Sequence, residues 1–185
     1  MIVAGIVGAE VAFWVVLGLA LATRYLLRRR RASTVLLWAL PLVDLALLGF
    51  VVADLASGAE PTQSHALAAS YLGFTVAFGR PLVRWADARF AHRFAGGPPV
   101  VKPAKGSAAY VRGLWVEWFR VVFAAGIAVV VLAFLALVVR QEPIPASLDQ
   151  AGPNPLWSQM LTLGIVVTVW FLAGPAFTRR TVHAS

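Results

Sequence analysis

Four ionisable side chains interrupt the long apolar stretches of this sequence, and their types are the ones that could do chemistry there. They are Glu10, Asp44, Glu117 and Arg120. Placing an ionisable group in an apolar medium is costly, so such a group usually has a partner or a function. The carboxylates of Glu10 and Asp44 are of the type that binds a cation or relays a proton.

Three more polar residues extend this candidate site. At about 1.5 Å per helical residue, Glu10, Asp44 and Tyr71 lie at similar depths in their apolar runs, with Asp54 and His65 nearer the same end. One hypothesis is a carrier site in which Glu10 and Asp44 hold a cation or proton and Tyr71 or His65 assists. The alternative, which we prefer, is that these groups bond neighbouring helices together.

A second polar group is predicted toward the opposite end of the helices. Arg80 and Glu117 fall at comparable depths, which predicts a structural ion pair. Arg120 then reaches the nearer interface or extends toward Asp44.

The elements that position these residues follow from composition. The chain has 185 residues, of which 60% are hydrophobic and 13% charged, too little polar surface for a soluble globule. A helical span needs roughly 20 apolar residues. We therefore predict an all-α polytopic transmembrane helix bundle, a single integral membrane domain over residues 1–185. Its five spans are predicted at residues 2–23, 33–55, 65–83, 114–139 and 156–177.

The third run is the richest in small residues, among them Ser70, Gly73 and Gly79. Small residues allow helix backbones to approach closely, so this helix is predicted to be the centre of the bundle.

Basic residues set the predicted orientation. Five Lys or Arg flank the end of the first run, seven lie between Arg80 and Arg112, and two follow the fifth run, whereas residues 56–64 have none. This alternation predicts an external N-terminus and a cytoplasmic C-terminus. The tryptophans agree with it, because Trp38, Trp85, Trp115 and Trp118 fall at the predicted inner interface and Trp157 at the outer one.

The linker at residues 84–112 is predicted to begin with an amphipathic helix lying on the inner membrane surface. Its aromatic side chains gather near one face and its charged side chains cover the rest. The expected contact is with anionic headgroups, and the alternative is a cytoplasmic protein partner. The residues of this predicted helix are Trp85, Asp87, Arg89, Phe90, Arg93 and Phe94.

Several function classes have no support in the sequence. It has no cysteine, its three histidines are scattered, and it has no glycine-rich phosphate loop and no nucleophile paired with a base. We expect no catalytic residues, no metal, no cofactor and no enzyme activity. The net charge of +8 comes from residues at the ends of apolar runs, so we expect contact with anionic lipid and no nucleic-acid binding.

A resemblance adds to this interpretation. The segment 41–45 around Asp44, the Tyr71-Leu72-Gly73 string and the Trp-Ala-Asp-Ala-Arg-Phe-Ala string at residues 85–91 resemble the uncharacterised bacterial YmcC-type integral membrane proteins. The resemblance covers residues 1 to about 105, and the remainder is similar only in having apolar spans. It implies a polytopic protein of the bacterial cytoplasmic membrane, with no assigned substrate, cofactor or reaction.

The sequence thus predicts a multi-pass membrane protein with a structural or partner-binding role, acting as a homo-oligomer or with another membrane protein. The alternative is a small cation- or proton-coupled carrier or channel that uses Glu10 and Asp44.

Overall fold

The computed structural model describes residues 2–25, 27, 29–94, 96–99 and 101–178. Some side chains inside the helices lie outside the described part, including those of Glu10, Trp38 and Phe94. All regular elements within the described ranges are helical, as predicted.

Each of the five predicted apolar runs forms one long helix. The helices are α1 (Ile2–Tyr25), α2 (Arg30–Ala56), α3 (Gln63–Phe94), α4 (Ala108–Ala133), which continues into the π-helical η1 (Phe134–Val139), and α6 (Pro155–Ala173). A four-residue helix, α5 (Leu148–Ala151), precedes α6, and the 3-10 turn η2 (Pro175–Phe177) follows it.

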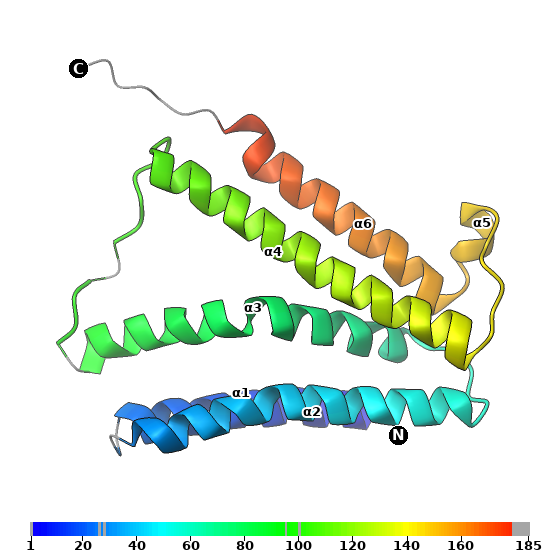
Figure 1. Ribbon diagram of the computed structural model, residues 1–185, viewed down its shortest axis with the longest axis horizontal. Helices are drawn as coiled ribbons and strands as arrows, with labels where there is room; N and C mark the ends of the chain where they lie inside the picture. Colours follow the sequence, from blue (N-terminus) through cyan, green and yellow to red (C-terminus); the bar gives the residue numbers. More distant parts are fainter. Residues whose placement is uncertain (1, 26, 28, 95, 100, 179–185) are drawn as a thin grey trace.

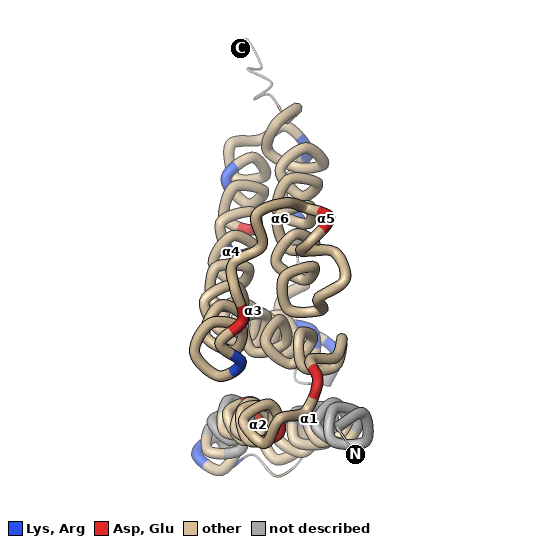
Figure 2. The backbone as a smooth tube through the Cα atoms, turned by 90° about the vertical axis from the view of Figure 1, so that its right-hand side faces the viewer, with Lys and Arg blue, Asp and Glu red and all other residues tan. Residues whose placement is uncertain are grey.

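The helices form three layers. Helices α1 and α2 lie side by side in the lower layer, α3 lies alone in the middle, and α4 and α6 lie side by side above it (Figures 1 and 2). Helix α3 therefore contacts α1, α2, α4 and α6. The prediction that the third helix is the centre of the bundle is confirmed.

The approach of α3 to α4 depends on Gly73. A Cβ atom on this residue would overlap the carbonyl oxygen of Ala124 and lie 3.2 Å from the backbone nitrogen of Ala128. The α3 and α4 backbones are thus in direct contact at this point, and Ala128 is fully buried there.

The prediction of a separate interfacial helix after residue 83 is wrong in one respect. Helix α3 runs without a break to Phe94, with Pro81 inside it. Asp87, on the C-terminal part of α3, pairs with Arg24 of α1 at 3.2 Å, and Ala86 beside it is buried. These contacts hold the basic segment in line with the rest of α3, against α1.

The two ends of the bundle differ. The end with the α2–α3 turn (residues 57–62) and the loop at residues 140–154 is called the turn end. The other, with the α1–α2 connection and the linker at residues 96–107, is called the linker end (Figure 1). The buried core lies toward the turn end, where α2, α3, η1 and α6 meet. Toward the linker end, α3 and α4 diverge (Figure 1).

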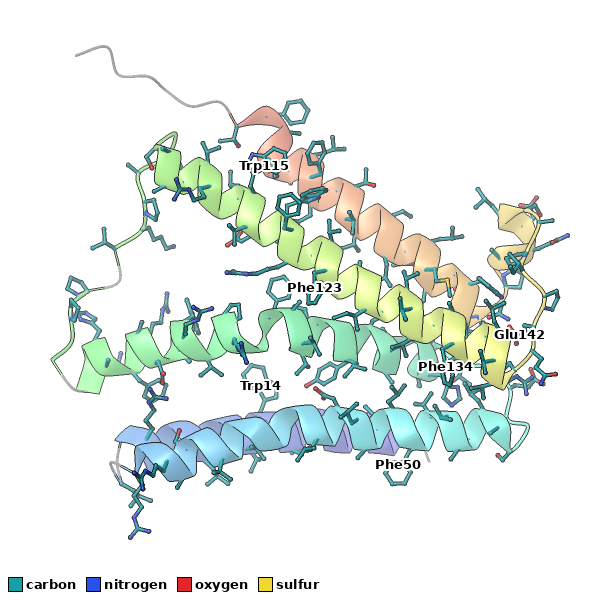
Figure 3. All side chains as sticks on the ribbon, in the orientation of Figure 1. Trp14, Phe50, Trp115, Phe123, Phe134 and Glu142 are labelled. Carbon is teal, nitrogen blue, oxygen red and sulfur yellow. The ribbon has the colours of Figure 1, made fainter. Side chains whose placement is uncertain are left out.

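Three helical segments are long and apolar enough to cross a membrane. Among the described residues these are Gln63–Arg93, Ala108–Val139 and Pro155–Phe177. Many large apolar side chains on the bundle are exposed, and Phe50 of α2 is 73% exposed and points away from the other helices (Figure 3). Such a surface is suited to hydrocarbon rather than water.

Candidate functional site

Asp44 is the most deeply buried carboxyl group that the structure describes. It lies in the middle of α2 and is 3% exposed. It forms a side-chain hydrogen bond with Thr75, which is buried on α3. Its Oδ2 atom has no hydrogen-bond partner among the described residues. Asp44 thus joins α2 to the central helix.

His65 forms a second, separate contact near the turn end. Its Nδ1 atom accepts a hydrogen bond from the backbone N–H of Thr62 at 3.0 Å, so that nitrogen is unprotonated. The proton of the neutral ring is therefore on Nε2, which donates to Oδ2 of Asp54 at 3.2 Å. This arrangement ties the end of α2 to the start of α3.

The position of His65 explains its role. Thr62 immediately precedes α3, and His65 is the third helical residue. In a capping box, the side chain at that position accepts the backbone N–H of the capping residue, usually through Glu or Gln. His65 makes that bond here with its ring nitrogen.

The predicted acidic cluster therefore divides into two contacts. Asp44 and Asp54 are ten residues apart on α2, about 15 Å along the helix axis. Tyr71 lies one helical turn before Thr75 on α3 and is half-buried. The structure brings Asp54 to His65, and Asp44 to the turn of α3 that follows Tyr71. The Glu10 side chain lies outside the described residues.

The predicted pair of Arg80 and Glu117 is not brought together. Both side chains are exposed, and neither takes part in an ion pair among the described residues. Arg120 is half-buried and likewise has no such partner in the described part of the chain. The reason is the divergence of α3 and α4 toward the linker end (Figure 1).

The segment at residues 84–94, predicted to lie at the membrane interface, has one contact of the kind expected in an amphipathic surface helix. The Arg89 guanidinium lies 4.5 Å from the centre of the Trp85 ring, and Trp85 is half exposed. Phe90 is half-buried and Arg93 exposed, while the Phe94 side chain lies outside the described residues. Asp87 belongs instead to the contact with α1.

Two polar networks at the turn end were missed by sequence reasoning. In the first, Gln63 donates to Gln159 at 2.9 Å, and Gln159 donates to the Ser70 hydroxyl at 3.0 Å. Gln159 is buried and joins α6 to α3. The sequence signal was available, because Gln159 is an amide near the start of an apolar run, where it needs a hydrogen-bond partner.

The second network closes the loop at residues 140–154. Arg140 lies 3.5 Å from Glu60 and 3.8 Å from Glu142, and Asn154 donates to Glu142 at 2.6 Å. Asn154 also accepts the backbone N–H of Leu156 and so caps α6. Asn before Pro155 at a helix start was the sequence signal for this cap.

Near the linker end, aromatic side chains join α4 to α6. Trp118 donates its indole N–H to the carbonyl of Val167 at 3.2 Å. The rings of Trp115 and Trp118 both pack against Phe171 of α6. Trp157 lies at the other end, packed against the buried core.

A cavity of about 610 Å³ lies between α3, α4 and α6, with Leu47 of α2 also in its wall. Its lining is almost wholly apolar, and its polar side-chain groups are the Ser70 and Tyr71 hydroxyls and the Trp170 indole N–H. Asp44, Asp54 and His65 do not line it. The lining residues are Leu47, Leu67, Ala68, Ser70, Tyr71, Phe74, Phe78, Val121, Ala124, Ala125, Leu163, Val166 and Trp170.

Long apolar helices, an outward-facing apolar surface and interhelical polar contacts together define a helical membrane protein. The chain belongs to the family of YmcC-type membrane proteins. It is 31% identical over 173 residues to a protein of Bacillus subtilis (strain 168) named "Uncharacterized membrane protein YmcC", and the match covers 92% of this chain and 90% of that protein. The similarity thus extends well beyond residue 105, where the resemblance was expected to end.

No family model matches the sequence, and no solved structure matches it.

Proposed function

We propose that this chain is a five-span protein of the bacterial cytoplasmic membrane with a structural or partner-binding role and no catalytic activity. Helices α1 and α2 have 24 and 27 residues, so each is longer than the roughly 20 residues that a span requires. The proposed partners are anionic lipid on the cytoplasmic side and, on the exposed helix faces, a second copy or another membrane protein.

Two features support an external N-terminus and a cytoplasmic C-terminus. The five long helices alternate in direction, so the Arg-rich α1–α2 connection, the basic linker and the end of α6 share one end (Figure 1). Lys and Arg near span ends favour the cytoplasmic side. Trp115 near the linker end and Trp157 near the turn end match the two aromatic belts of a membrane protein.

One observation carries the structural role: three internal polar contacts among the described residues join adjacent helices, and these groups do not share a polar cavity. Asp44 bonds to Thr75, His65 to Asp54, and Gln159 to Ser70. Polar side chains used in this way fix which helices associate and in which register. The cavity, by contrast, is apolar.

The carrier hypothesis has less support from the same contacts. A cation or proton carrier needs its carboxylates to converge on a space that water reaches. Its candidate residues are Glu10, Asp44, Tyr71 and His65. The Glu10 side chain lies outside the described residues, and of the other three only Tyr71 lines the cavity.

The two roles are separated by a flux measurement on the full chain. We expect purified protein in vesicles with an entrapped pH-sensitive dye to release a proton gradient no faster than empty vesicles, for the wild type and Asp44→Asn alike. Wild-type proton flux that Asp44→Asn removes would contradict the structural role and establish a carrier. A matched Asp149→Asn variant, at an exposed position on α5, controls for the loss of one negative charge.

A further inference from the structure

We propose that the cavity between α3, α4 and α6 holds an acyl chain of an anionic phospholipid, whose phosphate is bound by Arg80 and Arg120. This inference goes beyond the proposed structural role. It depends on the proposed topology only for the leaflet from which the lipid comes.

The cavity has the size and chemistry of a site for one hydrocarbon chain. Its volume of about 610 Å³ falls within the range of roughly 300–1,000 Å³ typical of small-molecule sites. Phe74 and Trp170 in its wall are about half exposed, so it opens sideways onto the surface of the bundle. In a membrane that surface faces lipid, which gives an acyl chain a direct path into the cavity.

Helical spacing sets the two arginines at the linker end of this cavity. The α3 and α4 backbones touch at Gly73 and Ala124 and then diverge toward the linker end (Figure 1). Arg120 lies one turn before Ala124 on the same face of α4. Arg80 lies two turns after Gly73 on the corresponding face of α3. The two positions therefore flank the opening where the helices separate.

The charges at this opening favour an anion. Arg80 is exposed and Arg120 half-buried, and neither has an ion-pair partner within the described residues. Glu117 lies one turn beyond Arg120 and is exposed, with no ion pair to either arginine. Two guanidinium groups against one exposed carboxylate leave a positive site, and guanidinium binds phosphate oxygens in a bidentate manner.

The depth of Arg120 matches the level of lipid phosphate. The residues between Arg120 and Arg140 are all apolar, and at 1.5 Å per residue they extend about 30 Å. This length equals the thickness of a bilayer's hydrocarbon core. Arg120 and Arg140 therefore mark its two boundaries, and a tail entering the cavity from the level of Arg120 belongs to the leaflet at the linker end.

Tryptophan quenching tests this site on the full chain, because Trp170 lines the cavity. The protein is reconstituted in phosphatidylcholine vesicles that contain a minor fraction of phosphatidylglycerol, with bromine on the acyl chains of one lipid or the other. The difference in tryptophan quenching between the wild type and Trp170→Phe gives the quenching of Trp170 itself, which reports the lipid at the cavity. We expect Trp170 to be quenched more by brominated phosphatidylglycerol than its mole fraction predicts.

Arginine variants test the headgroup contact. Each of Arg80→Gln and Arg120→Gln should lower the preference for phosphatidylglycerol about fivefold, as expected for one basic residue at a membrane surface. The matched control Arg112→Gln, on the first turns of α4, should retain it. Wild-type Trp170 quenching by brominated phosphatidylglycerol that only matches its mole fraction would overturn the proposal. An equal loss of preference in Arg112→Gln would overturn it as well.

A filling variant tests the tail contact. Val121→Phe, in the cavity wall, should reduce Trp170 quenching by either brominated lipid while circular dichroism retains the wild-type helix content. Unchanged quenching in this variant would also overturn the proposal. Trp170 quenching does not depend on the orientation of the protein in the vesicle. A protein with the reversed topology would therefore still show the preference for phosphatidylglycerol, whereas a protein without the lipid site would not.

Discussion

At the scale of single residues, Asp44 and Thr75 link α2 to the central helix through one buried contact. A carboxyl group buried among apolar helices usually faces the bundle interior and has a partner, since an isolated charge there is costly. We predict that Asp44→Asn, which keeps the shape and a hydrogen-bonding oxygen, unfolds close to the wild-type temperature. Asp44→Ala leaves Thr75 unpaired and should lower stability by about 1–3 kcal/mol.

Thermal unfolding in detergent, followed by circular dichroism, compares these variants. If Asp44→Asn lowers stability as much as Asp44→Ala does, an ionised carboxylate is required at this position. That result would bring the carrier hypothesis back into consideration.

His65 gives a second prediction at this scale. Because its ring acts as the third residue of a capping box, Gln at this position should replace much of its contact with the Thr62 backbone N–H. We predict that His65→Ala lowers stability by about 1 kcal/mol and that His65→Gln lowers it by less. Urea unfolding of the two variants measures the difference in stability between them. An equal loss of stability in both variants would exclude the capping role.

At the scale of helices, the contact of α3 with α4 is the tightest one described. Gly73→Ala must push the α3 and α4 backbones apart and should destabilise the protein by about 1–3 kcal/mol. Gly79, two turns along the same helix, has no atom within 4 Å of an added Cβ. Gly79→Ala is therefore the matched control and should be neutral or stabilising, because Ala is the better helix former.

Thermal unfolding of both glycine variants checks this prediction. If Gly73→Ala is as well tolerated as Gly79→Ala, the close crossing of α3 and α4 does not exist in the folded protein.

The sequence allowed the helices to be predicted well because long apolar runs leave a chain in lipid few alternatives to helix. The central place of α3 was also predictable, from Gly73 and its small neighbours. The unbroken continuation of α3 beyond Val83 as far as Phe94 was not predictable. It depends on the tertiary contact between Asp87 and Arg24, which lie far apart in the sequence.

The candidate site was predicted less completely, for a physical reason. Depth along a helix can be counted from sequence, but the direction in which each side chain faces depends on how the helices rotate against one another. The counted depths brought Asp54 near His65 correctly. They also suggested Arg80 with Glu117, whose helices diverge at that level (Figure 1).

At the scale of the whole molecule, the fold is a layered bundle whose buried core lies toward the turn end and whose surface is apolar. Polar bonds at the turn end close the bundle there, including those of Glu142, which lies at this end in Figure 3. The linker end is held by the Arg24–Asp87 pair and by the aromatic contacts of α4 with α6. A membrane around the apolar helices is what makes this surface stable.

The five-span topology is tested most directly by labelling single cysteines in intact bacterial cells, since the native chain has none. The positions are Ser57 and Ser147 at the turn end and Ala104 in the linker, all exposed. A membrane-impermeant maleimide should label Ser57→Cys and Ser147→Cys in intact cells, and Ala104→Cys only after the membrane is permeabilised. Labelling of Ala104→Cys in intact cells, or of all three positions from one side, would contradict the proposed spans and orientation.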